Sequence, residues 1–580
     1  MKGASTKTAQ DANRAVSVGE KFIYLFGATK FDMPAASKQC IKMSESARIL
    51  TTKGYSILKS AMTPSQTEIM QKSLLVAPKL NTKFATKAMQ EAASFKLYRE
   101  SPTRWYLPRA WSTAEFGPPE ESVVPEGLPL PESRVFTGKP YEYQENIIST
   151  FMNAGANGLI CVPCGKGKTF MALAIAARIG RRFLVIVDKE FLMNQWKGEM
   201  EALIPGIKIG IIQEDKKQIG DEEIVISKEP TVAEMKQRLR GLGLPISGKR
   251  EDLVARLKVD PTFSDKPVVE KVQYDCCIAL IQTLVRRDFA PTDFHSFGFT
   301  IFDECHHLGA QHFSKVLQRV QTKSMLGLSA TPTREDGLSK VFTWFLGEPV
   351  YWEKVREPDP TVEVKGVFIE TADVVYNTVP TDWRGEPVMA RLLGNILGCE
   401  DRNREILRWI LRLVKDGLTL EKKSQRKILI LSERIGHLNA IEELVRAADP
   451  TITMSYYIGG MKEDVREAGA ATSMILLASY AMASEAMNIK TLNTVILASP
   501  RKQVEQSTGR ILRIRADQRT VPPVIIDIID NHSMYLGQWR KRLTYYRKCN
   551  YQVERWEMKA ETGRLLTSKP KEAPKYEITD

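Results

Sequence analysis

The chain has 580 residues, 43% of them hydrophobic and 26% charged, a composition typical of globular rather than disordered or fibrous proteins. It contains no run of about 18 apolar residues, so we expect no transmembrane helix, and its first twenty residues lack the apolar core of a signal peptide, which predicts an intracellular protein. Lysine and arginine exceed aspartate and glutamate by 14, a balance that fits either a polyanionic partner, nucleic acid first among them, or a merely basic soluble enzyme.

Residues 1–137 contain no recognisable catalytic motif. They include a basic and aromatic stretch at 94–111, SFKLYRESPTRWYLPRAW, and then a segment at 116–138 rich in proline, glycine and glutamate, as in a linker. The eight cysteines of the chain are mostly isolated, which fits a reducing compartment and argues against a disulfide framework. We therefore expect an N-terminal accessory domain and linker over 1–137.

From residue 157 onward, short apolar runs alternate with amphipathic helical patterns, which predicts a parallel α/β sheet. A second alternating series begins near Val362, so the sequence predicts two α/β lobes in tandem. The expected strands of the first series lie at 157–163, 181–188, 275–282, 298–304 and 324–330. Those of the second lie at 363–370, 426–433, 471–479, 492–499 and 523–530.

Residues 229–258 interrupt the first series. They predict two short amphipathic helices around a Gly-Leu-Pro turn, an insertion that a loop between strands can accommodate at small entropic cost. The apolar positions at helical spacing are Met235, Leu239 and Leu242 in the first helix and Leu253, Val254 and Leu257 in the second.

The segment CVPCGKGKTF, residues 161–170, fits two kinds of chemistry. It lies between an apolar run and a helical pattern, the context of a phosphate-binding loop, in which Lys168 reaches the β- and γ-phosphates and Thr169 holds Mg²⁺. Val162 stands where the usual pattern has its first glycine. Cys161 and Cys164 instead have the spacing of a redox dithiol or half a zinc site, but no second C-x-x-C or H-x₃₋₅-H accompanies them. A buried structural cysteine pair is the better alternative.

The segment FTIFDECHHLGA brings two adjacent carboxylates to the end of an expected strand. Asp303 can help to hold Mg²⁺, and Glu304 can accept a proton from an attacking water. His306 and His307 do not predict a metal site, because adjacent residues at a strand end point in opposite directions. We expect them to couple the nucleotide site to neighbouring loops.

The segment GLSATPTRED (327–336) follows in the first lobe, and EQSTGRILRIR (505–515) in the second. Gln506, Arg510 and Arg513 lie at i, i+4 and i+7, on one face of a helix, from which the arginines could stabilise charge on a phosphate. A solvated arginine-rich face is the alternative for such a helix in isolation. The order of these motifs along the chain favours the catalytic interpretation.

Over about residues 138–540 the sequence resembles the superfamily 2 helicases. The glycine-rich loop, the DECH segment, the SAT segment and Q-x-x-G-R-x-x-R correspond to that superfamily's motifs I, II, III and VI, and KPYEYQ to its motif Q. The resemblance implies that ATP and Mg²⁺ are bound, that Gln144 reads the adenine edge, and that His306 couples to Ser329, Ala330 and Thr331. The loop residues implied in nucleotide binding are Pro163, Cys164, Gly165, Lys166, Gly167, Lys168 and Thr169.

Within the superfamily the sequence is most similar to the XPB and UvsW branch, through VPCGKGKT and the R-E-D triplet, and to helicases of large eukaryotic DNA viruses, among them the poxvirus transcript-release helicase. The insertion resembles a SAP motif, which implies binding of duplex DNA. The residues implied in nucleic-acid contact are Gln282, Thr283, Arg334, Glu335, Asp336, Gly459 and Gly460 in the lobes and Lys236, Arg240, Lys249 and Arg250 in the insertion. Motif V departs from the pattern, with Ala486 and Asn488 in place of glycine and aspartate.

The resemblance implies two tandem RecA-like lobes, at 138–355 and 356–537, with a SAP-like insertion at 225–262 and a basic aromatic tail at 538–580. Tyr545, Tyr546 and Tyr551 of that tail either stack on bases or, as we expect, pack a helix on the second lobe.

The implied function is that of a monomeric ATP-driven DNA helicase or translocase moving 3′ to 5′. It would hold duplex through the insertion and a single strand, or an RNA–DNA hybrid, across the lobes. Transcript release beside a viral RNA polymerase, at a viral replication site or in the virion, is the expected role. Remodelling of branched or damaged DNA is the alternative, and a DNA-tethering virion protein with a decayed ATPase is an alternative of another class.

Overall fold

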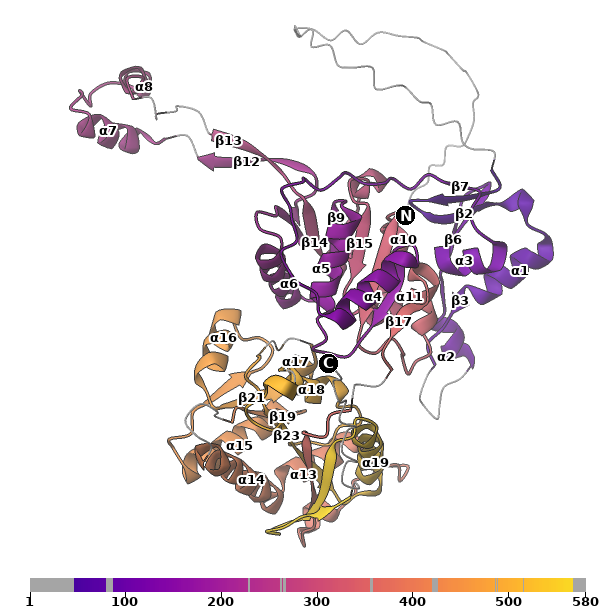
Figure 1. Ribbon diagram of the computed structural model, residues 1–580, viewed down its shortest axis with the longest axis vertical. Helices are drawn as coiled ribbons and strands as arrows, with labels where there is room; N and C mark the ends of the chain where they lie inside the picture. Colours follow the sequence, from indigo (N-terminus) through magenta and orange to yellow (C-terminus); the bar gives the residue numbers. More distant parts are fainter. Residues whose placement is uncertain are drawn as a thin grey trace, which may run out of the picture. The chain divides into compact units, whose positions relative to one another are not determined.

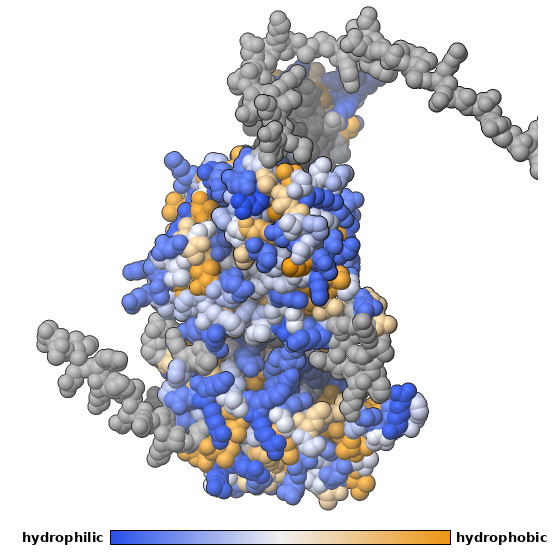
Figure 2. Space-filling view, turned by 90° about the vertical axis from the view of Figure 1, so that its right-hand side faces the viewer, coloured by the Kyte–Doolittle hydropathy of each residue, from blue (hydrophilic) through white to orange (hydrophobic). Residues whose placement is uncertain are grey.

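A computed structural model gives the fold of residues 46–79, 87–227, 230–260, 263, 268–354, 358–419, 426–485, 487, 489–514 and 516–566 (Figure 1). The described residues from Ala47 onward belong to one unit of the chain. Among the described residues, none of the helices combines the length and apolar character that crossing a bilayer requires. Hydrophilic side chains dominate the face in Figure 2, and the hydrophobic ones there form small separate groups.

A small N-terminal domain carries a sheet of order β5-β6-β2-β1-β7. Trp105 of the basic and aromatic stretch is buried in this domain, together with Tyr55 of β2, so the stretch contributes to the domain's core. Arg109 fixes this domain to the next one, because its guanidinium donates to the backbone oxygens of Thr322 (2.9 Å) and Lys323 (3.1 Å). Burial lowers the pKa of Arg109 to about 10. The elements are β1 (Arg48–Thr51), β2 (Gly54–Leu58), α1 (Pro64–Ser73), β3 (Leu75–Val76), α2 (Lys87–Ala92), β4 (Phe95–Lys96), β5 (Arg99–Glu100), β6 (Arg104–Leu107), α3 (Arg109–Phe116) and β7 (Glu121–Ser122).

The first large sheet has the order β11-β10-β14-β9-β15-β16-β8-β17, parallel except for the β10–β11 hairpin. Its central strands are buried on both faces, as continuous apolar runs require. Helices α4, α5 and α6 pack on one face and α9, α10 and α11 on the other. The strands are β8 (Asn157–Cys161), β9 (Phe183–Val187), β10 (Ile209–Gln213), β11 (Lys216–Lys217), β14 (Cys276–Leu280), β15 (Phe299–Phe302), β16 (Ser324–Ser329) and β17 (Pro349–Trp352). The helices are α4 (Glu142–Asn153), α5 (Lys168–Ile179), α6 (Glu190–Leu203), α9 (Ile281–Arg286), α10 (Gln311–Arg319) and α11 (Ser339–Leu346).

The second large sheet has the order β20-β21-β19-β22-β23-β18-β24-β25, and it is parallel up to β24. The predicted fold class, two tandem RecA-like parallel-sheet lobes with an N-terminal accessory domain, is therefore confirmed. The strands are β18 (Glu363–Ile369), β19 (Ile428–Ser432), β20 (Met454–Tyr457), β21 (Ile475–Ser479), β22 (Thr494–Leu497), β23 (Val524–Asp530), β24 (Gln552–Glu557) and β25 (Arg564–Leu565). The helices are α12 (Val374–Asn377), α13 (Met389–Gly398), α14 (Glu400–Thr419), α15 (Ile435–Ala448), α16 (Glu463–Thr472), α17 (Tyr480–Glu485), α18 (Glu505–Gly509) and α19 (Ser533–Lys548).

The tail packs on the second lobe rather than presenting its aromatic rings for stacking on bases. Tyr546 and Tyr551 are buried, and β24 pairs with β18 over six residues. The packed-helix interpretation is confirmed. The expected boundary after residue 537 falls inside α19.

The insertion joins the first lobe through an antiparallel ladder of β12 (Asp221–Ser227) and β13 (Val268–Gln273), beyond which lie α7 (Val232–Gly241) and α8 (Arg250–Leu257) (Figure 1). The helices enclose a small core of their own, made by Met235, Leu239, Leu253 and Leu257. Leu242, the third apolar position at helical spacing, lies just beyond the end of α7 and is 45% exposed.

Candidate active site

The glycine-rich loop runs from the end of β8 to the start of α5, so the amide groups of the first turn of α5 face the loop. Gly165 and Gly167 have φ values of +89° and +79°, which favour glycine. A Cβ on Gly167 would lie 2.5 Å from Nε2 of Gln144. The backbone is thus shaped to receive phosphate despite Val162 at the first position.

Gln144 on α4 holds this loop in place. Its side-chain amide donates to the backbone oxygen of Lys166 (3.2 Å), and its carbonyl oxygen accepts from the backbone N–H of Tyr141 (3.0 Å). It is only 4% exposed. A role in reading the adenine edge stays a prediction.

Lys168 and Glu304 form an ion pair, with 2.9 Å between Nζ and Oε1. Burial acts to lower the pKa of Lys168, but Glu304, with Cys164 and Asp303 nearby, holds that pKa above the ordinary value. Burial likewise acts to raise the pKa of Glu304, and Lys168 and His306 hold it well below the ordinary range. Burial, with the neighbouring Glu304 charge, raises the pKa of Asp303 to about 6. Two adjacent carboxylates, those of Asp303 and Glu304, therefore lie beside the Lys168 ammonium.

Asp303 follows the last residue of β15, and N–H donors fix both of its carboxylate oxygens. Oδ1 accepts from the backbone N–H of Glu304 (2.9 Å), and Oδ2 accepts from Nε1 of Trp196 on α6 (2.8 Å). Sequence reasoning missed Trp196, although a buried indole N–H generally needs a partner. Glu304 itself has a left-handed backbone, with φ 43° and ψ 50°, which is costly for a residue other than glycine.

His306 joins the DECH segment to the SAT segment. Its Nδ1 lies 3.0 Å from Oγ of Ser329 and 3.3 Å from Oε2 of Glu304. Oγ of Ser329 also accepts from the backbone N–H of Thr331 (3.1 Å), and Ala330 between them is half-buried. The geometry supports the predicted coupling of His306 to this segment.

The prediction that His306 and His307 point in opposite directions is wrong. Cys305–Gly309 is a 3₁₀ helix rather than a strand end, and the two imidazole centroids lie 4.2 Å apart. Within the described ranges, no group of three or more His, Cys, Asp and Glu side chains could hold a metal ion. Burial raises the pKa of the Cys161 thiol to about 12, so this cysteine belongs to the core rather than to a redox pair.

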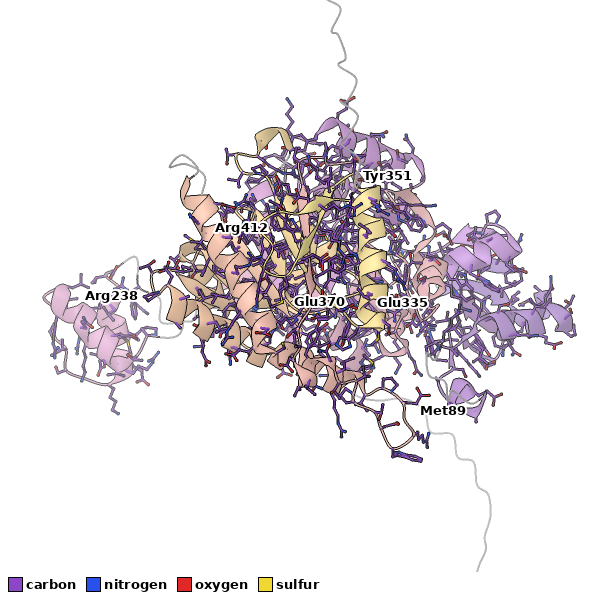
Figure 3. The ribbon with its side chains drawn as sticks, turned by 90° about the horizontal axis from the view of Figure 1, so that it is seen from below. Met89, Arg238, Glu335, Tyr351, Glu370 and Arg412 are labelled. Atoms are coloured by element: carbon purple, nitrogen blue, oxygen red, sulfur yellow. The ribbon has the colours of Figure 1, made fainter. Side chains whose placement is uncertain are left out.

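Arg334 and Asp336 bind each other rather than facing outward. The Arg334 guanidinium donates to both carboxylate oxygens of Asp336, at 3.0 and 2.5 Å, and to the backbone oxygen of His306 at 2.7 Å. Glu335, labelled in Figure 3, is more exposed than either neighbour, with 58% of its side chain accessible. The R-E-D segment is therefore attached to the DECH segment.

The arginines of the second lobe support a neighbouring loop of their own lobe. Arg510 donates to the backbone oxygens of Ala483 (2.6 Å) and Met487 (2.8 Å), and Arg513 donates to the same Met487 oxygen (2.6 Å). Burial, then the charge of Arg510, lowers the pKa of Arg513 to about 10. Gln506 lies on α18, but that helix ends at Gly509 and a 3₁₀ turn follows, so the expected continuous helical face is wrong.

This contact matters for the altered motif V, whose Ala486 and Asn488 lie outside the described residues. Met487, between them, is buried, and its backbone oxygen accepts hydrogen bonds from both Arg510 and Arg513. Sequence reasoning did not foresee it.

Several residues predicted to contact nucleic acid make internal bonds. Gln282 donates to the backbone oxygen of Asp188 (2.6 Å), and the buried hydroxyl of Thr283 accepts from the backbone N–H of Glu214 (3.0 Å). By contrast, Gly459 and Gly460 form an open turn in which an added Cβ would meet nothing within 4 Å.

The insertion carries seven lysines and arginines over 230–258 against three acidic residues. Arg238, on α7 in Figure 3, pairs with Asp260 at 2.7 Å, and Arg250 donates to the backbone oxygen of Pro230 at 2.9 Å. Lys236, Arg240 and Lys249 make no ion pair within the part of the chain that the structure describes. Arg240 and Lys249 are exposed and Lys236 is half-buried.

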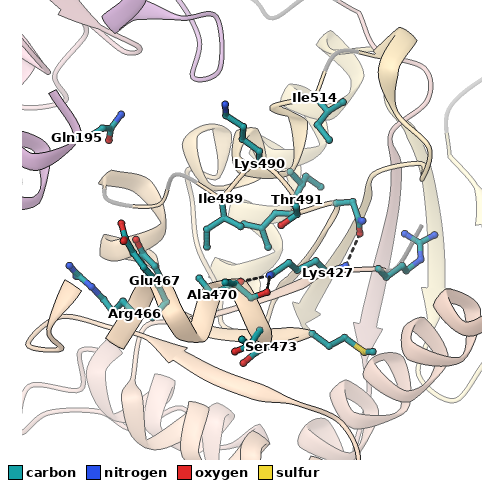
Figure 4. Close-up of a pocket in the computed structure, with 18 of the residues that line it drawn as sticks. Gln195, Lys427, Arg466, Glu467, Ala470, Ser473, Ile489, Lys490, Thr491 and Ile514 are labelled. Carbon is teal, nitrogen blue, oxygen red and sulfur yellow. Dashed lines mark hydrogen bonds between the residues drawn. The ribbon is translucent and has the colours of Figure 1, made fainter. Parts of the chain in front are cut away.

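Figure 4 shows a pocket apart from the glycine-rich loop, to which the second lobe contributes Lys427, Arg466, Glu467 and Lys490. The Lys427 ammonium donates to the backbone oxygen of Ala470. None of the candidate site residues predicted from the sequence lines this pocket, although Ile511 and Ile514 of the segment EQSTGRILRIR do. Its charges are of both signs, so it does not replace the glycine-rich loop as the candidate site.

The residues around the loop fit Mg²⁺. Asp303 and the hydroxyl of Thr169, in the first turn of α5, are the hard oxygen donors that this ion prefers. Oε2 of Glu304 accepts no hydrogen bond of ordinary geometry from the described residues, and the nitrogen facing it is Nδ1 of His306, 3.3 Å away.

Residues 137–334 match the family described as "Type III restriction enzyme, res subunit". A protein of Acanthamoeba polyphaga mimivirus, provisionally named ATP-dependent RNA helicase L396, is 28% identical over 515 residues, covering 87% of this chain and 86% of that protein. A similarly named protein of African swine fever virus, QP509L, is 23% identical over 407 residues, covering 67% and 68%. The crystal structure of T4 UvsW is 16% identical with a TM-score of 0.31, covering 86% of this chain and 96% of that one. Because this TM-score is low, the fold is assigned from the strand orders of the two large sheets and not from this likeness.

Proposed function

We propose that this chain, an ATP-dependent superfamily 2 enzyme related to viral helicases, couples ATP hydrolysis to movement along DNA. The observation that carries the proposal is the half-buried Lys168–Glu304 ion pair, with Asp303 beside it, at the mouth of the glycine-rich loop. The motifs predict a superfamily 2 ATPase, and that much is confirmed. Kinship with the XPB branch and with the poxvirus helicase stays a prediction.

In the proposed reaction the amide groups of the loop and of α5 bind the β- and γ-phosphates. Lys168 leaves Glu304 for the phosphate oxygens, and the freed Glu304 carboxylate accepts the proton of the attacking water. Thr169 and Asp303 would hold Mg²⁺, which supplies charge neutralisation on the phosphates. Arg510 and Arg513 would stabilise the charge that develops on the γ-phosphate.

Coupling to movement would run from Glu304 through His306 to Ser329. Nδ1 of His306 lies 3.3 Å from Oε2 of Glu304 and 3.0 Å from Oγ of Ser329. A change in the position of Glu304 on hydrolysis shifts the hydrogen-bond partners of His306. The second lobe would then step along the strand as the cleft opens and closes. We expect 3′ to 5′ movement from the motif resemblance alone.

DNA binding would use backbone contacts. Arg240, Lys249 and Lys236 on the insertion suit phosphate oxygens, and such contacts position a protein on duplex without reading bases. The open turn at Gly459 and Gly460 allows a strand to approach the backbone of the second lobe.

The test is DNA-stimulated ATP hydrolysis by Lys168→Ala and Glu304→Gln. We expect both variants to fold and to lose turnover by at least about a hundredfold. Lys197→Ala is the matched control, because Lys197 is an exposed lysine of the same lobe. Undiminished turnover in Lys168→Ala would refute the assignment, and absence of turnover in the unaltered protein would favour a tethering protein with a decayed ATPase.

The biological role that we propose is transcript release during viral gene expression, with remodelling of branched or damaged DNA as the alternative. A release factor frees RNA from a stalled ternary complex with a viral RNA polymerase, whereas a remodeller moves forks and four-way junctions without polymerase. The two viral relatives are named as RNA helicases, so RNA duplexes and RNA–DNA hybrids belong in the same panel.

A further inference from the structure

Trp196 places a hydrogen-bond donor inside the candidate site. Its indole lies on α6, is 1% exposed, and its Nε1–H donates to Oδ2 of Asp303 at 2.8 Å. We propose that Trp196 is a positioning residue that orients the Asp303 carboxylate for Mg²⁺. This inference depends on the proposed role of Asp303 in the ATPase site.

The need for such a donor follows from the carboxylate. The terminal torsion of an aspartate side chain is broad, so side-chain packing alone does not fix the plane of its oxygens. At Asp303 two N–H groups do so, the backbone N–H of Glu304 at one oxygen and the indole at the other. Without the indole, the carboxylate keeps one donor and can rotate about it.

The sheet explains how an indole reaches this carboxylate. Strands β9 and β15 are adjacent and parallel, with Ile186 opposite Phe302, and the backbone N–H of Asp303 donates to the oxygen of Ile186. Helix α6 begins three residues after β9 ends and buries one side on the sheet. Trp196 is on that buried side, together with Leu192, Met193 and Met200. The core position of Trp196 and its contact with Asp303 therefore arise from the same register.

A Trp196→Phe variant tests the donor, because phenylalanine keeps an aromatic ring in the core and removes the N–H. Trp409→Phe is the matched control. Trp409 is also buried and donates to a carboxylate oxygen, that of Glu405 at 3.1 Å, but it lies on α14 in the second lobe. Each variant loses one hydrogen bond from a buried indole to a carboxylate, but only the bond lost in Trp196→Phe lies at the candidate active site.

Two readouts separate positioning from packing. The first is Mn²⁺ binding in the presence of ADP, followed by electron paramagnetic resonance, which needs no turnover. The second is the Mg²⁺ concentration that half-saturates ATP hydrolysis. We expect Trp196→Phe to lower the affinity for Mn²⁺ and to raise the half-saturating Mg²⁺ concentration, each by about ten- to a hundredfold. Loss of a ligand-orienting hydrogen bond has an effect of this size at other metal sites. Excess Mg²⁺ should restore most of kcat, and Trp409→Phe should match the unaltered protein.

Metal binding by Trp196→Phe equal to that of Trp409→Phe would overturn the inference. If the Phe variant unfolds, the isosteric benzothienyl analogue of tryptophan at position 196, in which sulfur replaces the N–H, gives the same comparison. An Asp303→Asn variant distinguishes a failure of the Trp196 inference from a failure of the proposed function. If Asp303→Asn binds Mn²⁺ and ADP normally, the metal assignment itself is wrong. If Asp303→Asn loses Mn²⁺ binding while Trp196→Phe binds Mn²⁺ normally, only the role of Trp196 is wrong.

Discussion

Arg334 binds the carboxylate of Asp336 with two nitrogens and the backbone oxygen of His306 with a third. One side chain thus attaches the loop after β16 to the 3₁₀ turn that carries His306. The resemblance implied that this arginine contacts DNA, but its hydrogen bonds give it an internal role in the described structure.

Arg334→Lys should loosen this attachment, because an ammonium cannot reproduce the two-pronged bond to Asp336 together with the bond to the His306 carbonyl. We expect faster amide hydrogen exchange over residues 304–309 and weaker stimulation of ATP hydrolysis by DNA. Lys340→Arg, at a lysine on neighbouring α11, serves as the control. Unchanged exchange at 304–309 would contradict the internal role.

Gly167→Ala should abolish nucleotide binding. The new Cβ would lie 2.5 Å from Nε2 of Gln144, and the φ of +79° adds strain of about 1–2 kcal/mol. Gly180→Ala separates the two causes, since Gly180 also has a positive φ (+65°) but its added Cβ would meet nothing closer than 3.9 Å. Binding of a fluorescent ADP analogue measures the effect. Equal affinities in the two variants would show that the contact with Gln144 is unimportant.

His437 should make the second lobe acid-sensitive. Burial, then the charge of Arg402, lowers the pKa of this histidine to about 3, and its ring nitrogens lie 3.0 Å from Oγ of Ser432 and from Oδ1 of Asn403. In the unfolded chain the histidine takes up a proton near pH 6.5, whereas the folded state excludes it. The stability that depends on neutral His437 is thus fully present above about pH 6.5 and is lost as the pH falls toward 3.

The slope of that loss is about 1.4 kcal/mol per pH unit. Thermal unfolding followed between pH 7.5 and 5 should therefore show a smaller pH dependence in His437→Gln than in the unaltered protein. The exposed His312 offers the control, because His312→Gln should leave the slope as it is. An identical slope in His437→Gln would contradict the prediction.

The insertion should account for part of the salt dependence of duplex binding. Replacing Lys236, Arg240 and Lys249 with alanine removes up to three phosphate contacts, and each contributes about 0.9 to the slope of log K against log salt. We expect weaker, less salt-sensitive binding while ATP hydrolysis without DNA persists. Leu242→Ser changes an exposed apolar residue of the same insertion and should leave the slope unaltered. An unchanged slope in the triple variant would exclude the insertion from duplex binding.

The sequence was sufficient for the two sheets and the loop because their signals are local. Strands such as β9 and β23 are buried on both faces, and a parallel strand so buried is a continuous apolar run. The loop and its helix likewise occupy consecutive residues. The adjacent pair Asp303 and Glu304 could be assigned for the same reason.

The contacts that organise the candidate active site could not be predicted from local sequence patterns. Trp196 and Asp303 are 107 residues apart, and nothing near either of them in the chain indicates the other. Their meeting depends on the order β9-β15 in the sheet. Arg510 and Arg513 could be recognised by spacing, but their bond to the Met487 carbonyl depends on how two loops of one lobe fold back on each other.

Arg109 has a consequence for dissecting the protein. Its half-buried guanidinium donates to two backbone carbonyls just before β16, and α3 beside it packs Trp111 against Trp344 of α11. A protein shortened to start at the glycine-rich loop would leave those carbonyls and that apolar surface uncovered. The catalytic lobe is therefore not a separable module, and an inactive truncation would report lost support for the lobe rather than lost recognition of a substrate.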